Sequence, residues 1–214
     1  MSRTEFYAAV RPIFSGALSQ KQVDGIEALL AATEGLPITF RAYLLATAKH
    51  ETDDTMQPIA EYGKGKGKPY GKPGLYGQAQ YGRGYVQLTW DDNYERADEA
   101  LGLNGALLKD FNLAMQPTIA ANILVRGCSE GWFTGKKLAD YLPGNYRGAR
   151  RVVNGLDKAD LIAGYAREFE AALRLLPDAP LTPKPVADKT PAQTVAKPSF
   201  LARLIAWLTG QNSA

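Results

Sequence analysis

The sequence predicts a mostly α protein with at most a short β ribbon around residues 63–87. Two capping-box patterns, Ser2 with Glu5 and Ser19 with Gln22, mark helix starts near the N-terminus. Apolar residues then recur at helical spacing, while alternating strand patterns are rare. With 214 residues, 45% of them hydrophobic, the chain can bury one good core and carry a small appendage.

The N-terminal helices follow from these signals. After Ser19, the apolar residues Val23, Ile26, Leu29 and Leu30 share one helical face. A third helix is expected to begin after Pro37, because proline suits a first helical turn. Its apolar stripe is formed by Phe40, Tyr43, Leu44 and Ala48. This stripe leads directly to His50 and Glu51, so Glu51 is expected at a helix end.

Four further helices are expected toward the C-terminus. Thr89 and Asp92 can cap one that Gly102 ends, and Pro117 can open the next. The last two are expected over residues 146–153 and 159–173. Within the helix that follows Pro117, the apolar neighbours of Cys128 predict a small buried side chain.

The composition changes after Leu176, which predicts one folded domain over residues 1–176. Six prolines spaced by polar residues and alanine predict a flexible linker over residues 177–198. Residues 199–214 form a short tail whose segment 200–208 would be amphipathic as a helix. We expect this tail to make a weak contact with a membrane interface or with the folded domain, or to fray.

Charge and targeting signals narrow the function class. The net charge of +3 is mildly basic, which suits an anionic polymer but does not predict nucleic-acid binding. The single cysteine excludes an internal disulfide. The N-terminus lacks the apolar stretch of a signal peptide, and no apolar run is long enough to span a membrane. We therefore expect a monomer that is cytoplasmic on synthesis.

No metal or cofactor is expected. His50 is the single histidine, so no His-Glu-x-x-His motif is present, and Cys128 has no second cysteine beside it. The lysine–glycine segment 63–69 lacks the Ser or Thr of a phosphate-binding loop, which predicts a solvated basic loop. A Ser-His-Asp triad would have to recruit His50 from a helix end beside two glutamates, and no nucleophile elbow occurs.

Two carboxylates and a polar run offer a different chemistry. Glu51 ends an apolar helix, Glu61 follows ten residues later, and the glycine-rich segment 81–90 supplies polar side chains. Hydrolysis of a glycosidic bond needs one carboxyl to protonate the leaving oxygen and a second to activate water or to form a covalent intermediate. Burial at the edge of a core would raise the pKa of Glu51, as a general acid requires. Unpaired surface glutamates are the plain alternative.

The motifs His50-Glu51-Thr52, Glu61 and the segment 81–94 resemble family 19 glycoside hydrolases, the plant-type chitinases and phage endolysins of the same fold. Residues 152–155 resemble the later Asn-Gly motif of this family. The resemblance covers roughly residues 39–173 and implies a lysozyme-like helical catalytic domain with a cleft. It favours the compact bacterial or phage branch, because the chain lacks the disulfides and long insertion of the plant enzymes.

The resemblance also implies residue roles. Glu51 would be the general acid and Glu61 the general base of an inverting reaction, with their carboxyl groups roughly 6.5–9.5 Å apart. The implied contacts to sugar or water are His50, Tyr81, Arg83, Gln87, Thr89, Asn93 and Asn154. The plant pattern places an arginine where this chain has Leu161, and Arg83 or Arg151 are the candidates to replace its charge.

The substrate is open between two β-1,4-linked polymers. Peptidoglycan glycan strands and chitin both contain N-acetylglucosamine, so motifs that bind this sugar do not separate them. The absence of a signal peptide and the basic loop favour a peptidoglycan-degrading endolysin, which reaches the wall and periplasm after another protein opens the inner membrane. The alternatives are a chitinase, a lytic transglycosylase that needs a single glutamate, and a non-catalytic saccharide-binding module.

Overall fold

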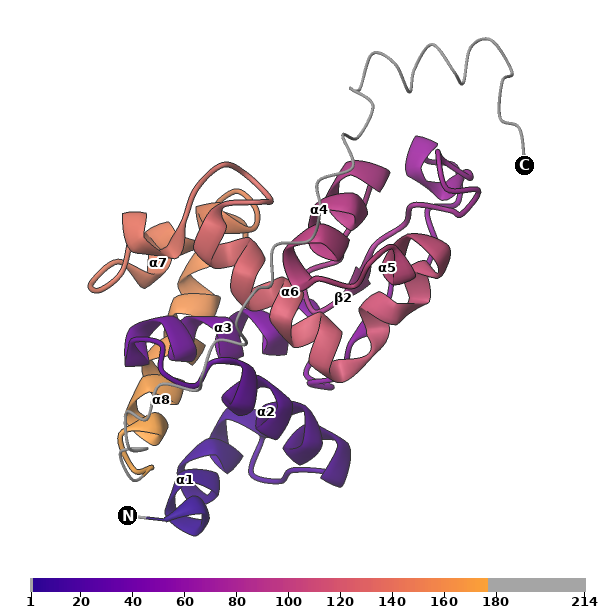
Figure 1. The fold of residues 1–214 in the computed structure, drawn as a ribbon. Helices are drawn as coiled ribbons and strands as arrows, with labels where there is room; N and C mark the ends of the chain where they lie inside the picture. Colours follow the sequence, from indigo (N-terminus) through magenta and orange to yellow (C-terminus); the bar gives the residue numbers. More distant parts are fainter. Residues whose placement is uncertain (1, 177–214) are drawn as a thin grey trace, which may run out of the picture. The chain divides into compact units, whose positions relative to one another are not determined.

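The computed structural model describes residues 2–176 and is mostly helical (Figure 1). Its α-helices are α1 (Arg3–Val10), α2 (Gln20–Ala32), α3 (Ile38–Glu51), α4 (Asp91–Leu101), α5 (Ala106–Lys109), α6 (Pro117–Glu130), α7 (Tyr146–Ala149) and α8 (Ala159–Leu173). Short 3-10 turns are η1 (Arg11–Phe14), η2 (Pro69–Gly71), η3 (Phe111–Met115), η4 (Leu138–Asp140) and η5 (Arg150–Val152). The predicted mostly α class is therefore confirmed.

Helix α3 lies at the centre of the folded domain. All of its residues from Ala42 to Lys49 are buried, so this helix has no solvated face over that stretch. Helix α8 packs along it, and α1 and α7 pack on α8 (Figure 1). On another side, α2 packs against α6. The end of α3 therefore has a position fixed by the core.

Most predicted helix boundaries are confirmed. Ser19 and Gln22 form the expected reciprocal capping box, and α3 begins directly after Pro37. Pro117 occupies the first turn of α6, and Gly102 ends α4 in the left-handed conformation that glycine tolerates. The helix predicted over residues 146–153 is divided into α7 and the 3-10 turn η5.

The predicted cap of α4 is wrong. The N-cap residue is Trp90, whose φ is 75°, and it makes no side-chain capping bond. The Thr89 hydroxyl instead donates to its near neighbour, the Gln87 carbonyl, at 2.7 Å. Two aspartates in the first turn, Asp91 and Asp92, place negative charge near the positive end of the helix dipole.

The β ribbon is short and begins earlier than predicted. Strand β1 (Ile59–Ala60) pairs antiparallel with β2 (Arg83–Gly84), so the first strand precedes the expected range of 63–87. Gly84 has a φ of 87°, and a Cβ there would lie 2.9 Å from the Ala114 carbonyl oxygen. Glycine is required at this point because the backbone approaches η3 closely.

The predicted linker, 177–198, and tail, 199–214, lie outside the described residues. In the part of the chain that the structure describes, no helix combines the length and the apolar character needed to cross a membrane.

Candidate active site

Glu51 is fixed by the last turn of α3 and by a buried arginine. Arg150 Nη1 donates to Glu51 Oε1 at 2.5 Å, and the arginine and glutamate side chains are 3% and 18% exposed. The turn itself is closed by Thr52, whose hydroxyl donates to the Ala48 carbonyl at 2.8 Å. Glu51 is thus a partly buried carboxylate with a defined orientation and a remaining path to solvent.

The charge of the Glu51 carboxylate acts on two nearby groups, His50 and Cys128. Burial lowers the pKa of His50, while the neighbouring Glu51 carboxylate opposes that shift. Burial raises the pKa of the Cys128 thiol, with a smaller contribution from Glu51. Cys128 is fully buried in α6, as predicted, and this burial keeps its side chain a neutral thiol.

Glu61 lies at the end of β1. Its backbone N–H donates to the Gly82 carbonyl at 2.8 Å, which extends the ribbon by one bond. Its two carboxylate oxygens accept from the Tyr70 hydroxyl at 3.3 Å and from the Gly82 N–H at 3.4 Å. Burial and then the charge of Glu61 raise the pKa of Tyr70, so this phenol remains a donor to the carboxylate.

Gln87, Thr89 and Asn93 form a connected polar group beside the ribbon. Gln87 Nε2 donates to the Ile59 carbonyl of β1 at 3.3 Å. The Thr89 hydroxyl reaches the Gln87 carbonyl, and Asn93 Nδ2 donates to the Thr89 carbonyl at 2.9 Å. The structure therefore links these three predicted residues to one another and, through Gln87, to the ribbon next to Glu61.

Arg83 does not fit the predicted role of a sugar contact. Its side chain is bonded inside the protein to the Ala79 and Tyr81 carbonyls, the Tyr94 hydroxyl and Asn112. The residue is 4% exposed, and its guanidinium lies 3.6 Å from the centre of the Tyr81 ring. Arg83 thus stabilises the glycine-rich turn, and the Tyr81 ring lies against the Arg83 guanidinium.

Asn154 follows η5, the turn that carries the arginine bound to Glu51. Its backbone N–H donates to the Arg150 carbonyl at 3.0 Å, and its side-chain oxygen accepts from the Gly155 N–H at 2.8 Å. Asn154 is exposed, so its amide nitrogen can reach a ligand. Asn154 is thus linked to Glu51 through Arg150, whereas Gln87, Thr89 and Asn93 are linked to the ribbon next to Glu61.

Three residues of the site were missed at the sequence level. Arg150, and neither Arg83 nor Arg151, supplies the guanidinium at Glu51. Leu161, which stands where the plant pattern has an arginine, is 46% exposed on α8. The Tyr70 and Trp90 rings meet edge to face with ring centres 5.5 Å apart, and Trp90 is 45% exposed beside the Glu61 group. Exposed aromatic faces of this kind suit the apolar face of a sugar. The position of Trp90 directly after Thr89 was the available signal.

The basic loop leaves the site directly after Glu61. The Lys64 N–H donates to the Glu61 carbonyl at 2.9 Å, and similar turns follow at Lys66 and Lys68. All three lysines are exposed, in agreement with the predicted solvated loop. Their positive charge lies within a few residues of the Glu61 carboxylate.

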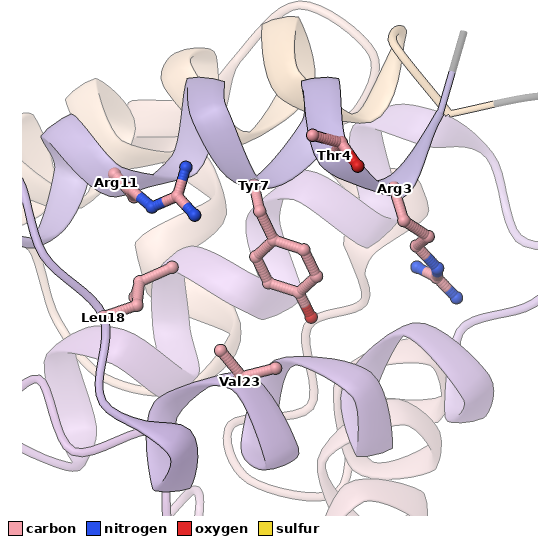
Figure 2. A pocket seen from close by; sticks show the side chains of 6 residues that line it. All are labelled: Arg3, Thr4, Tyr7, Arg11, Leu18 and Val23. Atoms are coloured by element: carbon pink, nitrogen blue, oxygen red, sulfur yellow. The ribbon is translucent and has the colours of Figure 1, made fainter.

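A separate pocket of about 290 Å³ lies between α1 and α2 (Figure 2). Arg3 and Arg11 flank the Tyr7 ring, and Leu18 and Val23 lie below it. Glu27 binds Arg3 at 3.0 Å and accepts from the Tyr7 hydroxyl at 2.7 Å, so these two polar side chains of the pocket already have a partner within the protein. None of the predicted site residues lines it. Within residues 2–176, no group of three metal-ligating side chains occurs.

Comparisons with known proteins identify the fold. No family model matches the chain. An Arabidopsis thaliana endochitinase, At2g43610, is 36% identical over 80 residues, which make up 37% of this chain and 26% of the endochitinase. The match therefore spans about a quarter of that relative.

Solved structures cover much more of the chain. Chitinase C from Streptomyces griseus has a TM-score of 0.55 and 24% identity over 81% of this chain and 76% of its own. A class IV chitinase of family GH19 from Zea mays has a TM-score of 0.52 and 20% identity over 84% of this chain and 95% of its own. The chain therefore has the mostly helical fold of family 19 glycoside hydrolases.

Proposed function

We propose that this protein is a glycoside hydrolase in which Glu51 is the general acid and Glu61 the general base. The observation that carries the proposal is the setting of the two carboxylates. Each is partly buried and held by donors, Glu51 by Arg150 and Glu61 by Tyr70 and Gly82. Among the ion pairs of residues 2–176, the Glu51–Arg150 pair leaves the least side-chain surface exposed, 18% and 3%, and it joins segments 99 residues apart. The likeness to chitinase structures supports the same reading.

Six of the predicted residues have a task in this mechanism. Glu51 gives its proton to the departing glycosidic oxygen, and Glu61 removes a proton from the attacking water. Thr89 and Gln87 position that water or a sugar beside Glu61, while Asn154 and His50 bind sugar beside Glu51. The proposed reaction inverts the anomeric centre, because water attacks directly without a covalent intermediate.

The substrate we propose is the glycan strand of peptidoglycan, with lysis of a host cell as the biological outcome. Its support is the exposed lysines at positions 64, 66 and 68, which begin three residues after Glu61. Peptidoglycan carries carboxylates on its stem peptides, whereas chitin is neutral. Positive charge beside the cleavage site therefore favours the anionic polymer. In this proposal the enzyme reaches the wall after another protein opens the inner membrane.

Chitin is the second candidate, because the relatives and neighbours are named chitinases. Zymography of the purified protein on peptidoglycan and on glycol chitin, side by side, separates the two. Clearing of peptidoglycan alone supports the endolysin, and clearing of glycol chitin alone supports the chitinase. A protein that binds these polymers but cuts neither would be a saccharide-binding module, and the proposal would be wrong.

The residue roles are tested by two amide variants. Glu51→Gln and Glu61→Gln keep the size and polarity of the side chain but cannot transfer the proton, so each should lower turnover by roughly 10²–10⁴-fold. Glu168→Gln on α8 is the matched control, because this glutamate is exposed and distant in sequence from both motifs. Loss in Glu51→Gln alone would favour a lytic transglycosylase. Proton NMR of the first-formed reducing end should show the α anomer.

A further inference from the structure

Arg150 binds three parts of the candidate site at once. Its Nη1 donates to Glu51 Oε1 at 2.5 Å, and its Nε donates to the Asp157 carbonyl at 3.1 Å. Its own carbonyl accepts from the Asn154 N–H at 3.0 Å. The buried Arg150 side chain therefore joins the end of α3 to the Asp157 end of the loop 154–157, while the Arg150 backbone binds the Asn154 end, which carries the proposed sugar contact.

The surroundings of the Arg150–Glu51 ion pair show how its two side chains are oriented. Within residues 2–176, Glu51 Oε2 has no protein partner, so the guanidinium binds one carboxylate oxygen and leaves the other unoccupied by protein groups. Val152, two residues later in η5, is fully buried and anchors the turn in the core. The arginine is thus fixed from both its backbone and its side chain.

We propose that Arg150 is a positioning residue that couples the orientation of Glu51 to the conformation of the loop 154–157. This inference rests on the proposed function, since it assigns Glu51 and Asn154 to the same reaction. When a sugar binds Asn154, the loop is held against the Asp157–Arg150 bond, and the same guanidinium keeps Glu51 Oε2 aimed at the leaving oxygen. Sugar binding and proton transfer are thereby linked through a single side chain.

The chemistry of arginine makes the proposal testable with a conservative change. A guanidinium presents several N–H groups in a rigid fork, so it can bind a carboxylate and a carbonyl in different directions. A lysine ammonium in the same place can keep the charge at Glu51, but its single nitrogen cannot also hold the Asp157 carbonyl. Arg150→Lys should therefore separate the two functions, while Arg150→Gln should impair both.

The kinetic test compares these variants with Arg151→Gln, whose exposed side chain lies next in sequence. Arg150→Gln should lower kcat by about 10–10²-fold, because a small displacement of a catalytic group has an effect of this size. Arg150→Lys should keep kcat within a few-fold of the wild type and raise KM several-fold. Millimolar guanidinium added to Arg150→Ala should restore part of kcat but not KM, since a free cation does not hold the loop. Equal effects of all three Arg150 variants on kcat and KM would overturn the coupling.

A second measurement does not depend on activity. Hydrogen exchange at the amides of residues 154–158 should speed up in Arg150→Lys and Arg150→Gln but not in Arg151→Gln, with circular dichroism confirming that each variant is folded. Unchanged exchange in both Arg150 variants would overturn the inference, even if Glu51→Gln is inactive. Faster exchange in a protein that cuts no glycan would instead support the role of Arg150 in the loop and refute the proposed function alone.

Discussion

Gly25, in the middle of α2, is predicted to be essential for the path of the chain between the two carboxylates. A Cβ at this position would lie 1.8 Å from the Met56 carbonyl oxygen and 2.8 Å from its carbon. Real Cβ atoms stay at least about 3.0 Å from such an oxygen, so Gly25→Ala requires a displacement of about 1.2 Å, which is 3.0 minus 1.8. The group to be displaced is backbone, which cannot simply change rotamer.

The expected loss of stability follows from two opposing terms. Forcing an extra methyl group into a packed site costs about 1–3 kcal/mol, and contact with backbone favours the upper value. Alanine is better than glycine inside a helix by about 1 kcal/mol. The net expectation is a loss of about 2 kcal/mol, which for a domain of this size lowers Tm by about 4–8 °C.

The substitution should also reduce activity. Met56 lies in the segment 52–58, which connects Glu51 at the end of α3 to Glu61 after β1. The Tyr85 hydroxyl donates to the same Met56 carbonyl at 3.2 Å, so the displacement disturbs the turn after β2 as well. Turnover should therefore decline even at temperatures where the variant is fully folded.

The assay is thermal unfolding followed by circular dichroism, with glycan turnover measured well below Tm. Gly164→Ala is the matched control, because it makes the same change inside α8 at a position with no atoms near the new Cβ. This control should be stabilised by about 0.5–1 kcal/mol. A Gly25→Ala variant as stable as the wild type, or one stabilised like Gly164→Ala, would refute the reasoning.

Two further predictions concern the neighbours of Glu51. Lys49 is 1% exposed, binds Asp54 and lies over the Phe14 and Tyr165 rings at 4.8 and 4.2 Å. Lys49→Met should therefore lower the free energy of unfolding by about 2–3 kcal/mol, measured by urea denaturation. A loss below about 0.5 kcal/mol would show that packing of the aliphatic part of the lysine side chain is sufficient. Because burial lowers the pKa of His50 in the folded protein, the unfolded chain binds more protons below the usual value of about 6.5. Stability should thus be complete above this pH and decline as the pH falls toward the lowered pKa, and His50→Asn should reduce the decline; an unchanged pH profile would contradict this.

The parts of the fold that the sequence could predict are those set by local chemistry. The bounds of α8 agree with the predicted range of 159–173, because its apolar residues keep one period throughout. The start of α2 is determined by the Ser19 capping box within a few residues. By contrast, Trp90 takes a positive φ because its N–H reaches the Gln80 carbonyl at 3.2 Å and its ring meets Tyr70. Local preference gives no sign of this arrangement.

The site shows the same division. Glu51 and Glu61 could be named from their motifs, but the partner of Glu51 is 99 residues away, where three arginines fall within five positions. Only tertiary packing selects Arg150 from that group. Arg83 shows the opposite error, since a polar residue in a glycine-rich turn suggests a ligand contact, while Tyr94 and Asn112 from later elements enclose it.

The position of Glu51 explains why a buried arginine is needed there at all. The C-terminal end of a helix carries a partial negative charge, which favours cations and disfavours a carboxylate in the last turn. Successive residues of a helix point about 100° apart, so Lys49 and Glu51 face different parts of the protein. The Lys49 ammonium lies over the Phe14 and Tyr165 rings and forms an ion pair with Asp54. It cannot also neutralise Glu51, and Arg150, from a separate segment, offsets the charge of the carboxylate and of the helix end together.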